Sequence, residues 1–212
     1  MPTLVYFDLG ARAEPMRMLL HHAKVQYEDK RVTGESWQEF KHSDKCPTGQ
    51  IPVYIDDEGR AFNQTVSILR YLGGQHGYIP DDLMARYYCD NAIDAVYGDL
   101  YSKEFNFRFF KDELAEEDIK DNVARFVKLH ANLEKLLAAH GGKYMAGDSL
   151  SIADFVVFGL HTCSALNATA KVAAHRDALN ESVAQFPLFS KYRAHMQEVF
   201  AEYIATRKPS SF

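Results

Sequence analysis

The chain has 212 residues, of which 47% are hydrophobic and 25% are charged, and its formal net charge at pH 7 is −5. This length suits one large domain or two small ones with enough apolar material for a core. The small acidic excess disfavours a nucleic-acid surface, which needs a basic patch. No apolar run approaches the roughly 20 residues that cross a bilayer, so we expect neither nucleic-acid nor membrane partners.

Targeting and cysteine signals point to a reducing compartment. The N-terminus lacks the basic stretch and long apolar run of a signal peptide. The three cysteines, Cys46, Cys89 and Cys163, are widely spread and odd in number, so a disulfide framework is not expected and a cytoplasmic location is. No cysteine pair has zinc-ligand spacing, and the adjacent His21 and His22 would point to different sides of a helix. We therefore expect no metal site.

The first 76 residues alternate strand and helix signals in the order strand, helix, strand, short helix, strand, strand, helix. The predicted strands cover 4–9, part of 25–32, 53–55 and 60–62, and the main predicted helices cover 13–22 and 66–72. Pro15 lies near the first helical turn, where its missing N–H costs little. Gly73-Gly74 is predicted to end the last helix.

Strand signals vanish after a predicted linker at 77–84. Helical patterns then cover 84–110, 119–139, 171–182 and 187–203, and a further helix begins at the capping-box sequence Ser151-Ile152-Ala153-Asp154. The apolar run after that box predicts a helix that is buried on most sides. The sequence thus predicts an α/β domain at 1–76 and an all-α domain at 85–212.

Tyr6, in the first predicted strand, has two interpretations. A tyrosine in a short apolar strand is usually a packed residue with its hydroxyl at the edge. A free phenol has a pKa near 10 and donates a hydrogen bond at neutral pH. Aimed at a thiol, it would stabilise the thiolate and lower the pKa of that thiol. The activated nucleophile would then belong to the ligand rather than to the protein.

Three further segments can each be structural or can bind a small peptide. Gln50-Ile51-Pro52 fits a turn before an edge strand, or a cis-proline site whose free Ile51 N–H and C=O pair with an extended ligand. Gln64-Thr65 opens a helix, with Thr65 as N-cap, and a helix start also favours a carboxylate. Trp37 and Lys41, four residues apart, share a helical face and fit a cation over an indole or a second carboxylate site.

Taken together, these segments resemble the cytosolic glutathione transferases, nearest the tyrosine-type sigma and pi classes. The similar stretches are 5–20, Trp37-Gln38-Glu39, Gly49-Gln50-Ile51-Pro52, Gln64-Thr65 and 147–154. The resemblance implies a thioredoxin-like N-terminal domain, an all-helical C-terminal domain and a homodimer with active sites near the interface. It also implies glutathione as co-substrate and a role in detoxification.

The same resemblance implies residue roles. Tyr6 would be catalytic and donate to the glutathione sulfur, and Arg12 would support the thiolate. The implied glutathione-binding residues are Tyr6, Arg12, Trp37, Lys41, Gln50, Ile51, Pro52, Gln64, Thr65 and Asp99, with Lys45 a further candidate. Cys46 matches a reactive cysteine position of the pi class, and we expect either a redox role or, with better support, an ordinary surface thiol.

Asp99 is offset by one residue from the family pattern. The family often has an aspartate that reaches the γ-glutamyl amine across the dimer. Aligned without a gap on Asp90 and Asp94, that position falls on Gly98, and Asp99 follows it. On a regular α-helix this offset rotates a side chain by about 100°.

The second substrate is expected in an apolar pocket, since most ligand sites are apolar clefts with few polar groups. The candidates are Phe7, Leu9, Tyr101, Phe105 and Phe212. Tyr101 and Phe105 would share a helical face, although such a stripe also fits helix packing. We expect conjugation of glutathione to small apolar electrophiles. The alternatives are a prostaglandin-type isomerase or peroxidase on the same scaffold, and a non-catalytic protein like the lens S-crystallins, against which the retained Tyr6, Trp37, Gln50 and Gln64 argue.

Overall fold

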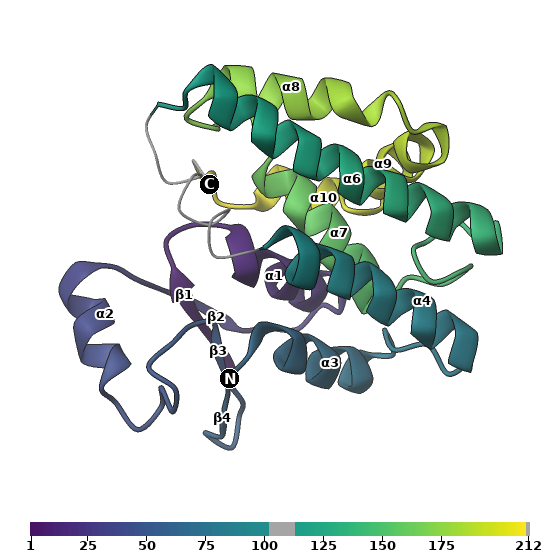
Figure 1. Cartoon of the computed structure of the whole chain (residues 1–212). Coiled ribbons are helices and arrows are strands. Elements are labelled where there is room, and N and C mark those ends of the chain that lie inside the picture. Colours follow the sequence, from purple (N-terminus) through teal and green to yellow (C-terminus); the bar gives the residue numbers. More distant parts are fainter. Residues whose placement is uncertain (102–112, 211–212) are drawn as a thin grey trace.

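The structure is a computed structural model that describes residues 1–101 and 113–210. Figure 1 shows a small sheet with its helices in the N-terminal part and a group of packed helices in the remainder. The strands are β1 (Thr3–Phe7), β2 (Glu28–Val32), β3 (Val53–Ile55) and β4 (Ala61–Phe62). The helices of the N-terminal part are η1 (Ala11–Ala13), α1 (Glu14–His22), α2 (Gly34–Lys41) and α3 (Thr65–His76).

The four strands form one mixed sheet in the order β2-β1-β3-β4. β1 pairs with β2 in parallel and with β3 in antiparallel orientation, and Tyr6 lies opposite Arg31. This is the thioredoxin-like arrangement that the sequence predicts. Because side chains alternate along a strand, Tyr6 enters the large core shared with the helical part, whereas Val5 enters a smaller cluster beside α2.

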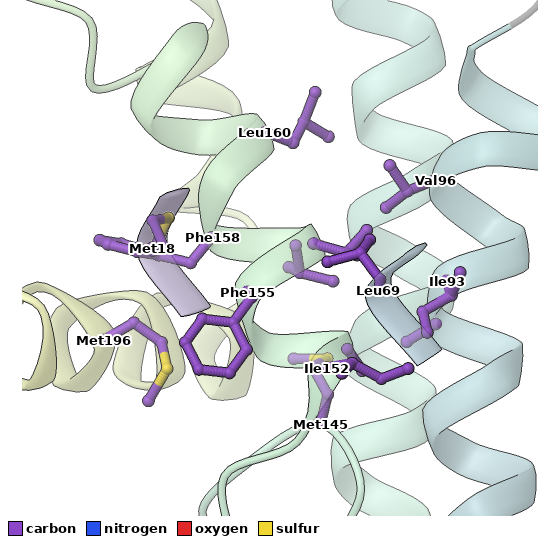
Figure 2. Packing of buried hydrophobic residues seen from close by; sticks show 14 of the residues in the cluster. Met18, Leu69, Ile93, Val96, Met145, Ile152, Phe155, Phe158, Leu160 and Met196 are labelled. Atoms are coloured by element: carbon purple, nitrogen blue, oxygen red, sulfur yellow. The ribbon is translucent and has the colours of Figure 1, made fainter. Parts of the chain in front are cut away.

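The helical part is built around α7. Its elements are α4 (Leu83–Asp94), η2 (Ala95–Leu100), α6 (Glu116–His140), α7 (Ile152–Cys163), α8 (Ala173–Val183), α9 (Pro187–Val199) and α10 (Ala201–Thr206). Every residue of α7 from Ile152 to Thr162 is buried, which confirms the prediction from its apolar run. Figure 2 shows Ile152, Phe155 and Phe158 of α7 among side chains of the neighbouring elements.

The capping box predicted before α7 is confirmed. The Asp154 carboxylate accepts hydrogen bonds from the N–H groups of Ser151 and Met145, both at 2.8 Å. A buried carboxylate with these partners holds the helix start and the preceding turn together. No helix in the described part of the chain has both the length and the apolar character that a membrane span requires.

The predicted stop of α3 at Gly73-Gly74 is wrong. The helix runs through both glycines and ends at Gly77, which has the left-handed φ of 78°. A Cβ atom on Gly73 would collide with Cγ2 of Ile152 on α7. Gly73 therefore allows two helices to approach closely, and Gly77 ends the helix.

Two other predicted helices are divided. In place of one helix over 84–110, α4 is followed by the wide turn η2, which ends at Leu100. Tyr101, with φ −76° and ψ 48°, is no longer helical. Residues 102–110 lie outside the described residues. The helix predicted over 187–203 breaks at Phe200, whose ring is buried and stacks on Phe158 at a centroid distance of 5.5 Å.

Candidate active site

A cavity of about 610 Å³ lies where β1, η1, α2, the turn before β3 and the start of α3 meet. Eight of the residues predicted for the site line it: Phe7, Arg12, Trp37, Gln50, Ile51, Pro52, Gln64 and Thr65. Segments up to 58 positions apart in the sequence thus contribute to one cavity. A second cavity, of about 780 Å³, lies between α1, β2 and α10 and is lined largely by paired charged side chains.

Tyr6 is 6% exposed and is not among the residues that line the cavity, but it packs beside Phe7, which is, and the backbone N–H of Arg12 lies near its hydroxyl. Burial raises the pKa of Tyr6, while this N–H and the charges of Arg12 and Arg17 partly oppose the rise. The Arg17 guanidinium lies 5.9 Å from the centre of the Tyr6 ring. The phenol is therefore protonated at neutral pH and can donate a hydrogen bond to a bound group.

Arg12 connects Tyr6 with the helical part. Its guanidinium carbon lies 5.6 Å from the ring centre of Tyr97 and 5.1 Å from that of Tyr101, within the range of cation–π attraction. The backbone before it is unusual, because Ala11 has a φ of 44°. Non-glycine residues rarely adopt this region, and they do so mainly where the surroundings hold them.

The turn before β3 forms another wall of the cavity. The Ile51–Pro52 peptide bond is cis, the geometry that the sequence interpretation required for a peptide-binding edge. Ile51 takes part in none of the loop hydrogen bonds among the described residues. The thiol of Cys46 donates to the carbonyl oxygen of Gln50 at 3.6 Å and so supports the turn.

Cys46 is not the surface thiol that we expected. It is 4% exposed and belongs to the small cluster with Val5, Val32, Phe40 and Val53. Burial raises the pKa of the Cys46 thiol. Because the reactive form of a cysteine is the thiolate, both its position and its pKa favour a structural role.

The start of α3 differs from the prediction in its cap. Gln64, with φ 67° and ψ 114°, is the N-cap, and Thr65 is the first helical residue. No side chain caps this end, so the first N–H groups of a helix that begins at the cavity have no side-chain partner. Such a helix start carries partial positive charge and favours a carboxylate.

On the opposite wall, α2 presents Trp37, whose ring meets the edge of Phe7 at a centroid distance of 5.3 Å. Lys41 is exposed and is not among the lining residues, but its aliphatic carbons pass beside Gly49: a Cβ there would be 3.8 Å from Lys41 Cε. Lys45 turns away, because its Nζ donates to the carbonyl oxygen of Gly59 at 2.8 Å.

The remaining predicted residues lie elsewhere. Leu9 packs against the main core rather than lining the cavity, and Tyr101 lies beside Arg12 outside the helix that was expected to align it with Phe105. Phe105 and Phe212 lie outside the described residues. Asp99 is exposed on η2, beside a separate small cavity near Arg125 and Lys128.

The wide turn η2 changes the expectation for Asp99. The N–H of Tyr101 donates to the carbonyl oxygen of Val96, five residues back, at 2.9 Å. In such a π-type turn, residues five apart lie above one another, as residues four apart do in an α-helix. Asp99 therefore follows Asp94 on one face of the helix, where a regular helix would place Gly98. The 100° rotation expected from the offset does not apply.

Thr48, Gly49 and Tyr97 were missed as site residues. Thr48 and Gly49 line the cavity next to Gln50, and Tyr97 stacks with Arg12. The spacing of Tyr97 and Tyr101, four residues apart on a predicted helix, was the available signal. The described part of the chain has no group of three or more His, Cys, Asp or Glu residues that could hold a metal ion.

The site thus combines an uncapped helix start, an indole and a turn in which Ile51 makes no loop hydrogen bond among the described residues, and the protonated Tyr6 phenol lies next to its lining residues Phe7 and Arg12. These are donors suited to a small ligand with carboxylate, amide and thiol groups. Models of the glutathione S-transferase N-terminal and C-terminal domains match residues 2–74 and 98–207, respectively.

Individual relatives agree with these matches. Glutathione S-transferase 1 of Ascaris suum is 29% identical over 217 residues, covering 99% of this chain and 98% of the relative. The crystal structure of the glutathione S-transferase from Ascaris lumbricoides matches with a TM-score of 0.81 at 28% identity and 100% coverage of both chains. S-crystallin SL11 of Nototodarus sloanii is 28% identical over 157 residues, covering 73% of this chain and 75% of the relative. The chain therefore belongs to the glutathione S-transferase family of enzymes.

Proposed function

We propose that the chain activates the thiol of glutathione through Tyr6 and transfers the resulting thiolate to small apolar electrophiles. The observation that carries this proposal is the buried Tyr6 phenol, which stays protonated at neutral pH and lies next to Phe7 and Arg12, two residues that line the 610 Å³ cavity. A hydrogen bond from this hydroxyl favours the ionised form of a neighbouring thiol.

Glutathione fits the cavity as an extended peptide. Its γ-glutamyl carboxylate would bind the N–H groups and hydroxyl at Thr65, with Gln64 beside it. Its backbone would pair with the N–H and C=O of Ile51. Its glycyl carboxylate would then lie at Trp37, with Lys41 reaching past Gly49.

The reaction needs few steps. The thiol proton leaves to solvent while Tyr6 donates its hydrogen bond to the sulfur and keeps its own proton. The sulfur lone pair forms the new bond to carbon. In a substitution the leaving group departs with the electron pair of its bond, and in an addition the electron pair of the attacked double bond takes up a proton from solvent. The electrophile would contact Phe7 and Tyr101, with Phe105 and Phe212 as further candidates.

We further propose a homodimer with two domains in each chain, 1–76 and 85–212, joined by the linker 77–84. The first turns of α4 support the dimer, because Leu83, Met84 and Tyr87 are 78%, 54% and 55% exposed, an unusual concentration of apolar surface. Asp99 would reach the γ-glutamyl amine bound to the partner subunit. The three free cysteines agree with a cytoplasmic role in detoxification.

The test is Tyr6→Phe, with Tyr54→Phe as the control that removes another buried phenol from the same sheet. Tyr6→Phe should retain glutathione affinity in calorimetry. It should raise the pKa of the bound thiol by about one to two units, because a hydrogen bond to a charged group is lost. Ultraviolet titration of the thiolate measures this pKa. The same thiol pKa in Tyr6→Phe and in the wild type would remove Tyr6 from the mechanism.

The similarity to S-crystallin SL11 supports a second candidate, a structural protein that retains the fold. The two functions differ in turnover rather than in binding. A purified protein that binds glutathione with a lowered thiol pKa and conjugates at least one member of a broad electrophile panel is an enzyme. Binding without turnover across the panel would favour the structural role.

A further inference from the structure

The residues that follow α10 lie against the loop that carries Arg12. Lys208 Nζ donates to both carboxylate oxygens of Asp8 at 2.7 Å. The N–H of Gly10 donates to Oγ of Ser210 at 3.3 Å. Figure 1 shows this yellow tail returning from α10 toward η1 and α1. Residues about 200 positions apart in the sequence are thus joined directly beside the candidate active site.

The tail is itself firmly held by the helical part. The carbonyl oxygen of Ser210 accepts hydrogen bonds from Asn167 Nδ2 at 3.0 Å and from Thr169 Oγ1 at 2.6 Å. Arg207 Nη1 donates to the carbonyl oxygen of Thr162 at 2.8 Å. Terminal segments usually fray unless such contacts hold them, so this tail can support the structure beside it.

The loop needs such support. After β1 it makes a tight turn, with the N–H of Leu9 donating to the carbonyl oxygen of Phe7 at 2.7 Å, and Ala11 has a φ of 44°. Conformations of this kind persist only where several contacts determine them. Arg17 Nη1 holds the carbonyl oxygen of Leu9 at 2.8 Å from within α1, and Lys208 holds the loop from outside.

The tail contacts the loop after β1 through the ion pair of Lys208 with Asp8. Lys208 lowers the pKa of Asp8 most strongly through its hydrogen bond, and Arg31 contributes from 3.1 Å. Four residues further along, the backbone N–H and the charge of Arg12 both act on the Tyr6 hydroxyl and oppose the rise of its pKa on burial. A shift of the loop would therefore move the Arg12 N–H and guanidinium relative to this phenol.

We propose that Lys208 is a positioning residue for thiol activation: by binding Asp8, it holds the loop that sets the Arg12 N–H against the Tyr6 hydroxyl. This inference rests on the proposed function of Tyr6. It predicts that a side chain at the end of the chain tunes the pKa of the bound thiol without contacting the substrate.

The test compares Lys208→Met with Lys24→Met. Lys24 is a matched control, because its Nζ pairs with Glu202 of α10 at 2.8 Å and also joins the two parts of the chain, but it does not contact the loop. Lys208→Met should raise the pKa of the thiol of bound glutathione by about half a unit. It should lower kcat/KM about two- to fivefold, the range expected for a partly exposed ion pair. Glutathione affinity should change little.

Additional variants separate positioning from loss of stability. Asp8→Asn combined with Lys208→Met should shift the thiol pKa no further than Lys208→Met alone, because both changes break one contact. Lys208→Arg should restore a pKa close to that of the wild type. Thermal unfolding of both methionine variants shows whether their stabilities match.

A wild-type thiol pKa in Lys208→Met would overturn the inference, and so would an equal shift in Lys24→Met, which would indicate a general effect of α10. If Lys208→Met does not fold, a raised thiol pKa in Lys208→Arg would likewise count against the inference. Failure of the proposed function is recognised separately, because the wild-type protein itself would then leave the pKa of glutathione at its value in water.

Discussion

His130 and His161 should make the stability of this protein fall steeply in mild acid. Both side chains are 0% exposed and their ring centres are 5.1 Å apart. None of their ring nitrogens has a hydrogen-bond partner among the described residues. Burial lowers the pKa of His130 to about 3 and that of His161 well below its usual value, and the charge of Arg193 adds to both effects.

The sign and size of this change in stability follow from how many protons the folded and the unfolded chain bind. The unfolded chain binds a proton at each histidine near pH 6.5, whereas the folded chain does not, so folding stability is complete above that pH and is lost as the pH falls toward the folded pKa. Between about pH 7.5 and about pH 5, each histidine removes about 2 kcal/mol from the free energy of unfolding. The pair together removes about 4 kcal/mol.

His130→Phe isolates half of this effect. The His130 ring stacks on Phe189 at a centroid distance of 4.9 Å, so a phenylalanine preserves an aromatic contact and removes two unpaired nitrogens. Urea unfolding at a series of pH values, at one protein concentration, gives the free energy. The variant should lose about 2 kcal/mol less than the wild type over this interval.

The control is His42→Gln, which removes an exposed imidazole and should leave the pH dependence unchanged. Where phenylalanine is too large for the site, His130→Leu gives the same comparison with a smaller side chain. The reasoning fails if His130→Phe or His130→Leu retains the full pH dependence of the wild type.

Three other outcomes are expected from the described contacts. Gly73→Ala should lower the free energy of unfolding by about 1–3 kcal/mol, because its Cβ meets Ile152. Gly74→Ala should raise this free energy by about 0.5–1 kcal/mol, because the space around Gly74 is open. Equal effects of the two variants in urea unfolding would contradict this. Cys46 should react with an alkylating reagent much more slowly in the folded protein than in urea, since it is 4% exposed. Mass spectrometry of the labelled peptide measures both rates, and equally fast labelling in the folded protein would contradict the prediction. Asp154→Ala should cost about 2–4 kcal/mol by leaving two buried N–H groups without their acceptor, and a thermal midpoint like that of the wild type would argue against this role.

Signals confined to neighbouring residues were the ones that sequence reasoning read correctly. The two neighbouring strands predicted at 53–55 and 60–62, Pro15 in the first turn of α1 and the Ser151–Asp154 capping box all depend on local backbone chemistry, and all are present. Predictions failed where a distant contact decides. The role of Gly73 depends on Ile152, and the burial of Cys46 depends on a cluster assembled from three strands and α2.

The candidate site shows the same division. The motifs around Gln50 and Gln64 have little meaning alone, and their resemblance to a family brought them together. The structure places them in one cavity. Backbone angles such as φ 67° at Gln64, and with them the true cap of α3, leave no trace in residue types. The contact of Arg12 with Tyr97 and Tyr101 likewise depends on how the two parts of the chain pack.

The widened turn at Ala95–Leu100 accommodates one additional amino acid without a surface loop. Two chains that differ by this single residue can therefore keep the same helices in the same places. An alignment that runs through the turn without a gap loses register from there on, and Gly98 then takes the position that we propose for Asp99. The length of a helix in residues and its length in ångströms are therefore separate quantities at this turn.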